Sequence, residues 1–275
     1  TTTTTLPAPP TDQLATDLLS FRRHPTPLAE RAAGDAAIAA LSSKSDALLD
    51  AVGEGSCVQV ADGPTVVAEE SPGAAVIPAS NEKLFVAAVA LDVLGPDYRF
   101  RTELQAPAPV GGVVAGSVYL VGGGDPLLRT ADVVDPLTYP SFNTTALEAL
   151  ADQLVVLGVT QIDGDIVGDG TRYDDEFRAD DEWGDEITVR DAGRVDALLV
   201  NDGLISPTDY ALDPTRAAAG AFRDLITARD VTIVGSAANG VRPTDGSLTT
   251  LALIESAPLT DVLVEMLHTS DNNTA

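Results

Sequence analysis

A serine and a lysine at the start of one apolar stretch have the types and the spacing for acyl transfer. Ser80 and Lys83 are three positions apart, so a helical turn would place both side chains on one side. There the lysine amine could take the hydroxyl proton of the serine, and apolar surroundings would favour the neutral amine. Backbone N–H groups at a helix N-terminus would stabilise an anion that develops next to Ser80. The sequence therefore predicts a nucleophile, a base and part of an oxyanion site within one turn.

A simpler interpretation gives these two residues no chemistry. Ser80 could cap the helix and Lys83 could extend into solvent, which is what an isolated S-x-x-K pattern usually means. The composition argues against it, because Lys44 and Lys83 are the only lysines in the 275 residues. We therefore treat the pair as a candidate site and ask which elements position it.

The stretch from Pro78 to Leu94 is predicted to be the helix that carries the pair. It contains mostly good helix formers, Pro78 precedes its first turn, and Gly95 followed by Pro96 ends it. Beyond Lys83 the stretch is almost wholly apolar, so we expect the helix to be buried on all sides.

Hydrophobic periodicity and turn signals predict an α+β protein around this helix. A helical segment at 12–53 precedes a hairpin that turns at Asp62 and Gly63. Further helices are expected at 145–157, from Pro214 onward and at 258–267, and strands at 100–105, 116–121, 161–167, 231–234 and 250–256. Residues 169–196 are predicted to be a loop and 197–204 a pair of short strands that turn at 201–203. The similar order of helix and strand in 145–167 and 214–234 suggests an internal duplication.

The charge and the cysteine content exclude several classes of protein. The chain has 42 acidic and 16 basic residues, a net charge of −26 that repels nucleic acid and anionic lipid. We therefore expect no nucleic-acid partner, and the acidity also serves solubility. Cys57 is single and can form no internal disulfide, and with His24 and His268 as the only histidines no zinc-type cluster is expected.

The N-terminal residues suggest a protein that works outside the cytoplasm. Five threonines are followed by a Pro-rich segment, so residues 1–11 are predicted to be a disordered linker. Such a linker is typical of a mature chain that follows a signal or anchor segment, although an arbitrary chain boundary would explain it equally. No run of roughly eighteen apolar residues is present. The expected location is the cell envelope, either secreted or at the outer face of the cytoplasmic membrane.

Ser270, Asp271 and Asn272 form a second candidate motif, S-x-N, after the last predicted helix. Taken alone, such a triplet is typical of a turn or a helix cap. A turn here could also project the side chains of Ser270 and Asn272 into a cleft. The occurrence of both motifs in this order favours the interpretation as a site.

With both motifs the chain resembles the penicillin-recognising serine enzymes. More narrowly, it resembles the D-alanyl-D-alanine carboxypeptidase/endopeptidase family, the class C low-molecular-mass penicillin-binding proteins. The similar segments are 78–84, 91–103, 123–127, 161–165 and 270–272. That family carries a large insertion between the two motifs, and here Ser80 and Ser270 are separated by 190 positions.

The resemblance implies a split domain. The expected fold is a penicillin-recognising serine transpeptidase-like (β-lactamase-like) α+β domain built from residues 12–98 and 246–275. A large α/β domain would be inserted at 99–245, with a small sub-domain around 166–205.

The resemblance also implies a reaction, D-Ala-D-Ala acyl transfer on peptidoglycan stem peptides. Ser80 would attack the peptide carbonyl carbon and Lys83 would accept its proton. Ser270 would relay a proton toward the leaving amine, and Asn272 would hold the amide carbonyl of the peptide and support Lys83. No metal or organic cofactor is implied, and β-lactam antibiotics would bind covalently.

Two residues of the insertion are implied to contact substrate. The family carries D-x-[ST]-x-[FY] after a strand, and residues 169–173 match this pattern. By resemblance, Asp169 and Tyr173 would contact the free amine end of the peptide side chain. An ordinary acidic loop is the alternative for both.

One part of the family pattern is absent, since no K-T-G occurs in the 275 residues. The strand that carries it supplies a cationic group for the substrate carboxylate and a second oxyanion N–H. Loss of one oxyanion donor costs on the order of 3–4 kcal/mol in the barrier. We therefore expect the domain to be incomplete, to lack a C-terminal segment with the K-T-G strand, and to be inactive as this chain alone.

Two other functions stay open at this point. Ser80 and Lys83 would also serve an esterase or a β-lactamase-like acyl hydrolase, although the long insertion disfavours these. A noncatalytic peptidoglycan-binding or assembly protein could keep the same fold.

Overall fold

The structure is a computed structural model that describes residues 26–53, 55–132, 142–174, 176–177, 192–206 and 209–275, with side chains from residue 31 onward. The chain divides into two compact units, Thr1–Pro78 and Ala79–Ala275. Each unit is described by itself. The predicted linker at 1–11 and the helical pattern at 12–25 lie outside the described residues.

The first unit consists of a helix and a hairpin. Helix α2 spans Thr26–Asp50, and strands β1 (Val58–Asp62) and β2 (Thr65–Glu70) pair in the antiparallel sense. Gly63 lies in the turn with φ of 55°, a left-handed conformation that glycine adopts without steric cost. The hairpin that Asp62 and Gly63 predict is therefore confirmed.

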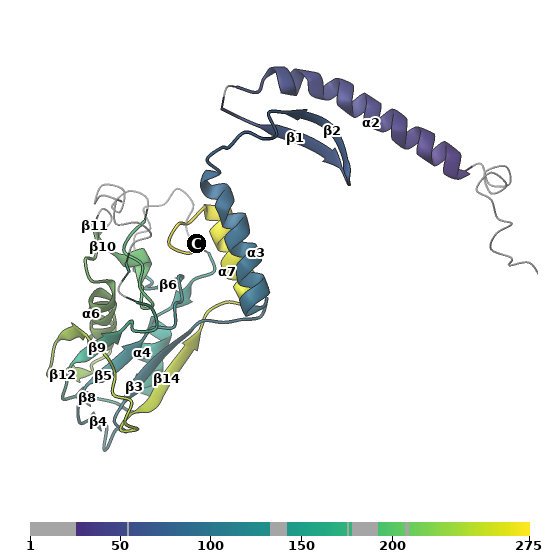
Figure 1. The fold of residues 1–275 in the computed structure, drawn as a ribbon. Helices are drawn as coiled ribbons and strands as arrows, with labels where there is room; N and C mark the ends of the chain where they lie inside the picture. Colours follow the sequence, from purple (N-terminus) through teal and green to yellow (C-terminus); the bar gives the residue numbers. More distant parts are fainter. Residues whose placement is uncertain (1–25, 54, 133–141, 175, 178–191, 207–208) are drawn as a thin grey trace, which may run out of the picture. The chain divides into compact units, whose positions relative to one another are not determined.

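A five-stranded sheet forms the centre of the second unit (Figure 1). Its order is β13-β9-β5-β3-β14, with bounds Ala237–Asn239, Ile166–Asp169, Val118–Val121, Arg101–Ala106 and Thr249–Glu255. The first three strands are parallel, and β3 is antiparallel to both β5 and β14. The predicted boundary at 245 falls before β14, and yet this strand pairs with β3, which belongs to the region predicted to be inserted.

Helices α4 (Glu148–Val156) and α6 (Pro214–Thr227) pack against the sheet over a common hydrophobic core. Its largest fully buried side chain is Phe222 of α6, and Leu104 and Leu120 of the sheet are also fully buried. Asp213 caps α6 by accepting a hydrogen bond from the N–H of Arg216 at 2.9 Å. Both helices are confirmed, with α4 starting three residues later than predicted.

A second, smaller sheet has three strands in the same order as their successors in the large sheet. It contains β12 (Thr232–Ile233), β8 (Gln161–Ile162) and β4 (Val113–Val114), all parallel. In three places a short strand of this sheet runs through a glycine into a strand of the large sheet: β4 into β5, β8 into β9 and β12 into β13. The orders α4-β8-β9 and α6-β12-β13 support the internal duplication that the sequence suggests.

The three connecting glycines, Gly116, Gly164 and Gly235, lie against one another. Their close approach leaves no room for a Cβ on Gly164 or Gly235. The N–H of Gly164 donates to the carbonyl of Gly116 at 3.0 Å, and that of Gly235 donates to the carbonyl of Gly164 at 3.2 Å. A Cβ on Gly164 would lie 2.4 Å from the carbonyl carbon of Gly116, and one on Gly235 would lie 2.5 Å from the carbonyl oxygen of Gly164. Backbones approach this closely only where Cβ is missing.

Several elements differ from the sequence-based predictions. The single strand predicted at 161–167 is two strands in two sheets, β8 and β9. The strand pair predicted at 197–204 is wrong: residues Asn201–Gly203 form the 3-10 turn η3, followed by a hairpin of β10 (Leu204–Ser206) and β11 (Asp209–Tyr210). Strands β6 (Leu128–Arg129) and β7 (Thr145–Ala146), a parallel pair, were not predicted.

The helix predicted to carry the catalytic pair forms, but its environment differs from the expectation. Helix α3 spans Lys83–Leu94, is preceded by the 3-10 turn η2 (Ala79–Glu82) and ends at Gly95, whose φ is 85°. Burial on all sides is wrong: Phe85 is 72% exposed and Val93 71%. Within the described part of this unit, α3 is covered mainly by helix α7 (Leu259–Thr269), through a cluster around Ala87 and Met266. Among the described residues no helix combines the length and the apolar character needed to cross a membrane.

Candidate active site

Helices α3 and α7 lie side by side and run in opposite directions (Figure 1). The end of α3 meets the start of α7, where the N–H of Leu259 donates to the carbonyl of Tyr98 at 2.8 Å. Tyr98 also packs edge-on against Phe100, and both rings rest on the cluster between the helices. This antiparallel packing brings the start of α3, with the S-x-x-K motif, to the end of α7, with the S-x-N motif.

Four side chains of the two motifs meet at this point. The Nζ atom of Lys83 lies 3.3 Å from Oγ of Ser80 and 2.6 Å from Oδ1 of Asn272. Oγ of Ser270 donates to Oγ of Ser80 at 2.9 Å. Lys83 is buried, with 6% of its surface exposed, whereas Ser80 and Ser270 are exposed. A hydroxyl open to substrate thus contacts an amine shielded from water and a second hydroxyl.

The backbone is strained on both sides of this cluster. Ala79 precedes Ser80 with φ of 49°, and Ser270 ends α7 with φ of 60°. Left-handed backbone costs a non-glycine residue roughly 1–2 kcal/mol, and such conformations gather at functional sites. The C-cap position explains why Ser270 turns away from the helix axis toward Ser80.

Asp271, between the two S-x-N residues, serves the loop itself. Its carboxylate accepts from the N–H of Asn273 and from the N–H of Thr274, both at 3.1 Å, and from the hydroxyl of Thr274. This is the local hydrogen bonding that aspartate typically provides in turns. The turn interpretation therefore holds for Asp271, while Ser270 and Asn272 face the first motif.

Asp169 lies at the end of β9 and is 1% exposed. Its Oδ1 accepts from the N–H of Thr171 at 3.0 Å and from the Thr171 hydroxyl at 2.5 Å. Its Oδ2 accepts from the N–H of Arg242 at 3.0 Å and pairs with the Arg242 guanidinium at 3.3 Å. Burial raises the pKa of Asp169, but these hydrogen bonds and the Arg242 charge outweigh it and hold the pKa below its usual range. A substrate amine would have to replace one of these partners.

Tyr173 lies in the segment that follows β9 and is 43% exposed. Its hydroxyl rests against the backbone of Gly124, where a Cβ would lie 2.2 Å from the oxygen. Burial raises the pKa of Tyr173, and the nearby Arg172 charge opposes the rise. The partial exposure of Tyr173 is compatible with the predicted substrate contact.

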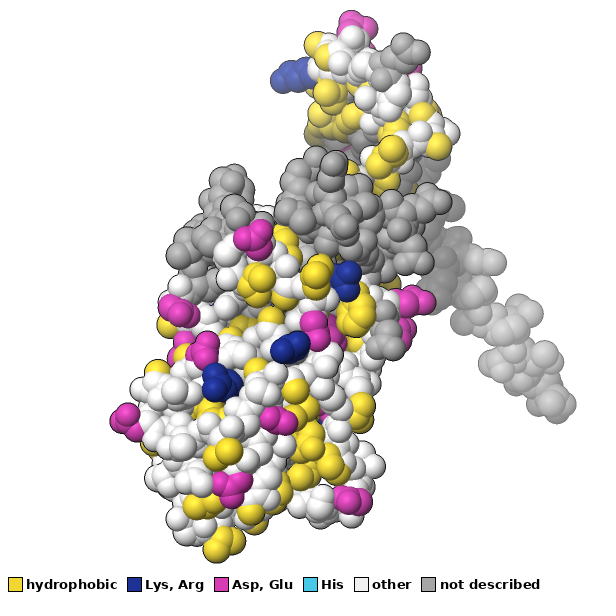
Figure 2. Space-filling view, turned by 90° about the vertical axis from the view of Figure 1, so that its left-hand side faces the viewer, with side chains coloured by type: hydrophobic (Ala, Val, Ile, Leu, Met, Phe, Trp, Pro, Cys, Tyr) yellow, Lys and Arg dark blue, Asp and Glu magenta, His cyan; other side chains and the backbone are white. Residues whose placement is uncertain are grey.

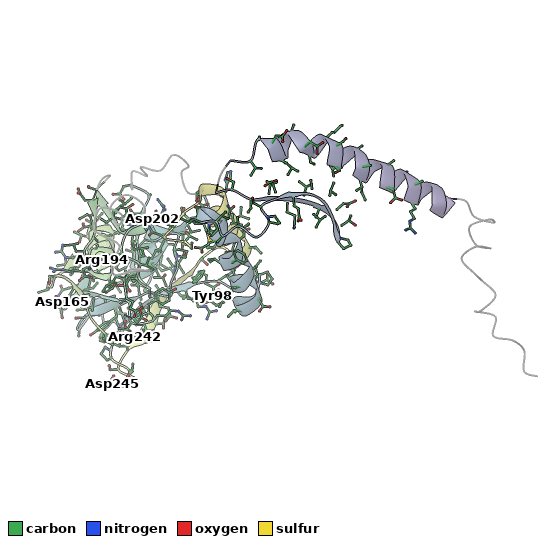
Figure 3. All side chains as sticks on the ribbon, turned by 45° about the horizontal axis from the view of Figure 1, so that its top comes forward. Tyr98, Asp165, Arg194, Asp202, Arg242 and Asp245 are labelled. Carbon is green, nitrogen blue, oxygen red and sulfur yellow. The ribbon has the colours of Figure 1, made fainter. Side chains whose placement is uncertain are left out.

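A cavity of about 730 Å³ opens over the end of the five-stranded sheet, on the face that β3 turns away from the core. Tyr98 and Arg242, both labelled in Figure 3, line it together with Arg101, Thr171 and Arg172. Its size is ordinary for a ligand pocket. Neither residue of the S-x-x-K motif is among the lining residues, so the geometry does not connect this cavity to the candidate nucleophile.

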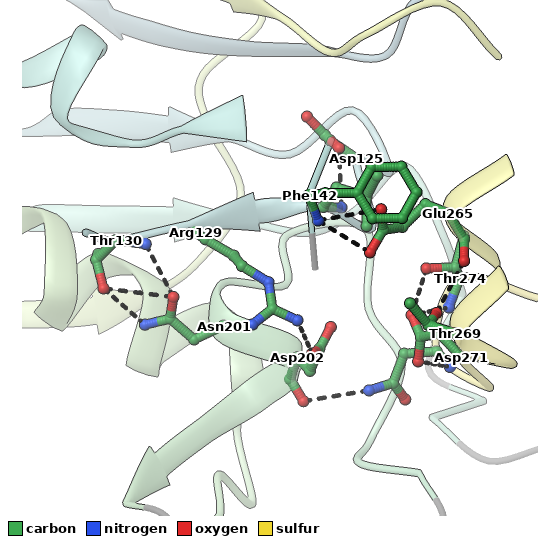
Figure 4. Close-up of polar contacts among 12 residues, drawn as sticks. Asp125, Arg129, Thr130, Phe142, Asn201, Asp202, Glu265, Thr269, Asp271 and Thr274 are labelled. Carbon is green, nitrogen blue, oxygen red and sulfur yellow. Dashed lines mark hydrogen bonds and ion pairs between the residues drawn. The ribbon is translucent and has the colours of Figure 1, made fainter. Parts of the chain in front are cut away.

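Sequence reasoning missed four buried charged side chains. Asp125 is 3% exposed, and burial raises its pKa above the usual range. Glu265 of α7 is fully buried, and its carboxylate accepts from the N–H of Phe142 at 3.1 Å. Arg129 and Asp202 form a buried ion pair (Figure 4). The position of Asp125 between a glycine turn and a proline was a weak signal, but the other partners lie far apart in the sequence and gave none.

The acidic side chains of the protein do not form one patch on the face that Figure 2 shows. They are spread singly over it, between neutral and apolar residues. A dispersed charge of this kind keeps a protein soluble rather than steering one ligand to one place. Within the described part of the chain no three His, Cys, Asp or Glu side chains gather as a metal site.

Comparison with known proteins supplies a family. Residues 35–240 match the D-Ala-D-Ala carboxypeptidase 3 (S13) family. A D-alanyl-D-alanine carboxypeptidase of Actinomadura sp. is 38% identical over 133 residues, which are 48% of this chain and 22% of that protein. A carboxypeptidase of Mycobacterium tuberculosis is 34% identical over 204 residues, which are 71% of this chain and 41% of that protein. The chain thus spans less than half the length of these curated relatives.

Solved structures give the same answer for the fold. Penicillin binding protein 4 of Haemophilus influenzae matches with a TM-score of 0.65 at 18% identity, over 85% of this chain and 63% of that one. The same protein complexed with a novel β-lactam matches with a TM-score of 0.50 at 18% identity, over 72% and 53% of the two chains. At this identity the likeness shows the fold alone, an α+β fold like that of penicillin binding protein 4. Because the family match covers well over half of the 275 residues, the chain belongs to the D-Ala-D-Ala carboxypeptidase 3 (S13) family of serine peptidases.

Proposed function

We propose that the gene product with this chain is a serine-type D-Ala-D-Ala carboxypeptidase/endopeptidase that acts on peptidoglycan stem peptides. The observation that carries the proposal is the position of Lys83, whose amine contacts both Ser80, at 3.3 Å, and Asn272, at 2.6 Å. A nucleophile and a base within hydrogen-bond reach, with the base held by a third group, is the arrangement that covalent acyl transfer needs. Membership of the family supports the choice of substrate.

In the proposed first step, Ser80 Oγ attacks the carbonyl carbon of the penultimate D-Ala and Lys83 accepts the hydroxyl proton. The bond from that carbon to the nitrogen of the terminal D-Ala breaks, which leaves an ester on Ser80. The departing amine takes a proton through Ser270, whose hydroxyl lies 2.9 Å from Ser80 Oγ. Asn272 holds the amide carbonyl of the peptide and orients Lys83.

In the second step, water attacks the ester carbon, and the proton that it loses returns to Ser80 Oγ as the acid departs. The start of α3, which follows Ser80 by three residues, would favour the anion formed in both steps, because the N-terminus of a helix carries unpaired N–H groups and the positive end of the helix dipole. A β-lactam would follow the first step and stop there. The Haemophilus influenzae relative complexed with a β-lactam is in line with this.

Substrate contacts beyond the reacting atoms are assigned to Tyr173 and Asp169. We assign Tyr173 the direct contact with the amine end of the peptide side chain, because this residue is partly exposed whereas Asp169 is buried. Asp169 could take part only if the amine displaced Arg242 or Thr171 from its carboxylate. The proposed place of action is the cell envelope, where the stem peptides are.

This chain alone is proposed to be inactive, because it contains no K-T-G sequence to supply the second oxyanion donor. A measurable carboxypeptidase rate from the 275 residues by themselves would refute that part of the proposal.

The experiment that tests the function is intact-mass analysis of the complete gene product after exposure to benzylpenicillin, with Ser80→Ala as the control. A stable adduct that maps to Ser80 and is absent from the variant is expected. If the folded wild-type protein forms no adduct, the proposal fails and a noncatalytic peptidoglycan-binding protein takes first place. Rapid loss of the adduct would instead indicate a β-lactamase-like hydrolase.

A further inference from the structure

The turn η3 contains two successive residues in an unfavourable backbone conformation. Asn201 has φ of 57° and Asp202 has φ of 54°, both left-handed. Such strain persists only where the surrounding structure holds it in place, and it is often part of a functional arrangement.

A buried ion pair and a side-chain clamp fix η3 to the end of β6 (Figure 4). The guanidinium of Arg129 pairs with the carboxylate of Asp202, and their side chains are 7% and 6% exposed. Oδ1 of Asn201 accepts from the N–H of Thr130 at 2.8 Å, and Nδ2 of Asn201 donates to the Thr130 hydroxyl at 2.9 Å. The planar guanidinium fork favours one geometry of the pair, so the turn has one position relative to β6.

The clamped turn contacts the loop of the second motif through Asn273. Nδ2 of Asn273 donates to the backbone carbonyl of Asp202 at 3.4 Å. Oδ1 of the same side chain is buried and accepts no hydrogen bond from any described residue. A buried amide with one unused acceptor is a poor choice for stability alone. Among the described residues, the hydrogen bond that this side chain makes is the Nδ2 contact with η3.

Asn273 is also the residue next to Asn272, in a loop with little internal freedom. Asp271 accepts hydrogen bonds from the N–H groups of Asn273 and Thr274, which tie together the loop between Ser270 and Thr274. A shift of Asn273 would therefore displace Ser270 and Asn272, which contact Ser80 and Lys83. Displacements of about 1 Å can cost on the order of a hundredfold in rate when reacting groups must be aligned.

We propose that Arg129, Asp202 and Asn273 are positioning residues that set the S-x-N loop against the S-x-x-K motif. The inference rests on the proposed function and goes beyond it, because none of the three touches the reacting atoms. By this proposal the region predicted to be inserted helps to shape the active site, because its turn η3 supports the S-x-N loop and fixes the loop's position.

The test is the acylation of the complete gene product by benzylpenicillin, followed by rapid-quench mass analysis. Asn273→Ala should lower the first-order acylation step three- to tenfold, the factor expected for one hydrogen bond that acts through alignment. The dissociation constant of the initial noncovalent complex and the melting temperature should stay near the wild-type values. A role in stability alone would move the melting temperature and leave the acylation step unchanged.

Two further variants keep the test decisive. Asn273→Asp has the same shape but no side-chain donor, and it should reproduce the loss even if the alanine variant folds poorly. Asn239→Ala removes a similar amide that bonds Asp213 at 2.7 Å, at the far edge of the sheet, and should acylate within twofold of wild type. Asp202→Asn should also slow acylation, and combined with Asn273→Ala it should add little, because both act through one contact.

The outcomes separate the two proposals. If wild-type protein forms no adduct at Ser80, the proposed function fails and this inference fails with it. If wild type is acylated and both Asn273 variants show the wild-type acylation step, the function stands and the positioning role is overturned. A parallel fall in the Asn239 control would overturn it as well, because the effect would not be specific to the loop.

Discussion

Replacement of Asp169 by asparagine should lower the free energy of unfolding of the second unit, and the contacts of the Asp169 carboxylate give the size of the loss. Asparagine preserves the shape and the two bonds from Thr171, but its amide nitrogen would face the N–H and the guanidinium of Arg242. A hydrogen bond to a charged group contributes about 1.5–3 kcal/mol, and an ion pair with a partly exposed arginine adds less than 1 kcal/mol. The expected loss is therefore about 2–3 kcal/mol at pH 7, a fall of roughly 4–12 °C in melting temperature.

The loss should also depend on pH with a definite sign. The pKa of Asp169 is lowered in the folded protein, whereas the unfolded chain has an ordinary value of about 3.9. A lowered folded pKa contributes stability that is fully present above the unfolded pKa and is lost as the pH falls through the folded pKa. The difference between wild type and Asp169→Asn should thus be constant near neutrality and shrink below about pH 4.

Urea unfolding of the full chain across this pH range measures both effects. Asp245→Asn is the control, because the exposed carboxylate of Asp245 makes only local hydrogen bonds with the side chain and the N–H of Ser247. These bonds also lower the pKa of Asp245, so the midpoint of this variant should shift much less than that of Asp169→Asn. The reasoning is refuted if Asp169→Asn matches wild type at pH 7, or if their difference does not shrink in acid. If the variant is fully stable but has lost affinity for the substrate, the result would instead support the predicted contact between Asp169 and a substrate amine.

Three further outcomes are expected. Asn272→Ala removes the 2.6 Å contact with Lys83 and should slow acylation by benzylpenicillin about 10- to 150-fold, which stopped-flow or mass analysis would measure. Asp125→Asn removes a carboxyl whose pKa is raised by burial, so the variant should be about 1 kcal/mol more stable than wild type at pH 7. This advantage should be lost as the pH falls through the raised folded pKa and should be absent below about pH 4, the ordinary value of the unfolded chain, as urea titrations at both pH values would measure. Gly124→Ala puts a Cβ 2.2 Å from the Tyr173 hydroxyl, at a residue with φ of 86°. The backbone conformation alone should cost about 1–2 kcal/mol in the free energy of unfolding, so a thermal scan should show a melting temperature lowered by several degrees.

The sequence was most informative where local chemistry decides the structure. The turn at Gly63, the stop of α3 at Gly95 and the helix that starts at Pro214 all follow from residues with strong conformational preferences. The proximity of Ser80 and Lys83 follows equally from their spacing on one turn. These features need no knowledge of the rest of the chain.

The features that sequence could not give depend on partners far along the chain. Asn201, Asp202 and Gly203 have the composition of a hairpin turn, and their sequence does not reveal that Arg129 and Thr130 hold them as the turn η3. Phe85 is exposed because no described element of the second unit packs over it. An apolar sequence pattern cannot reveal whether such a covering element is present. Likewise, the burial of Asp169 depends on Arg242.

The stacked glycines that join the two sheets have a consequence for how the protein folds. Each connection commits one segment to both sheets, and each segment pairs with another that is distant in sequence. The parallel pairs between these segments cannot form early from local contacts, so folding should be slow, because the loop-closure entropy must be overcome before this pairing stabilises the chain. For the same reason neither sheet can open alone. Amide hydrogens of β9 and of β8 should therefore exchange with the solvent together, as one cooperative unit rather than as two.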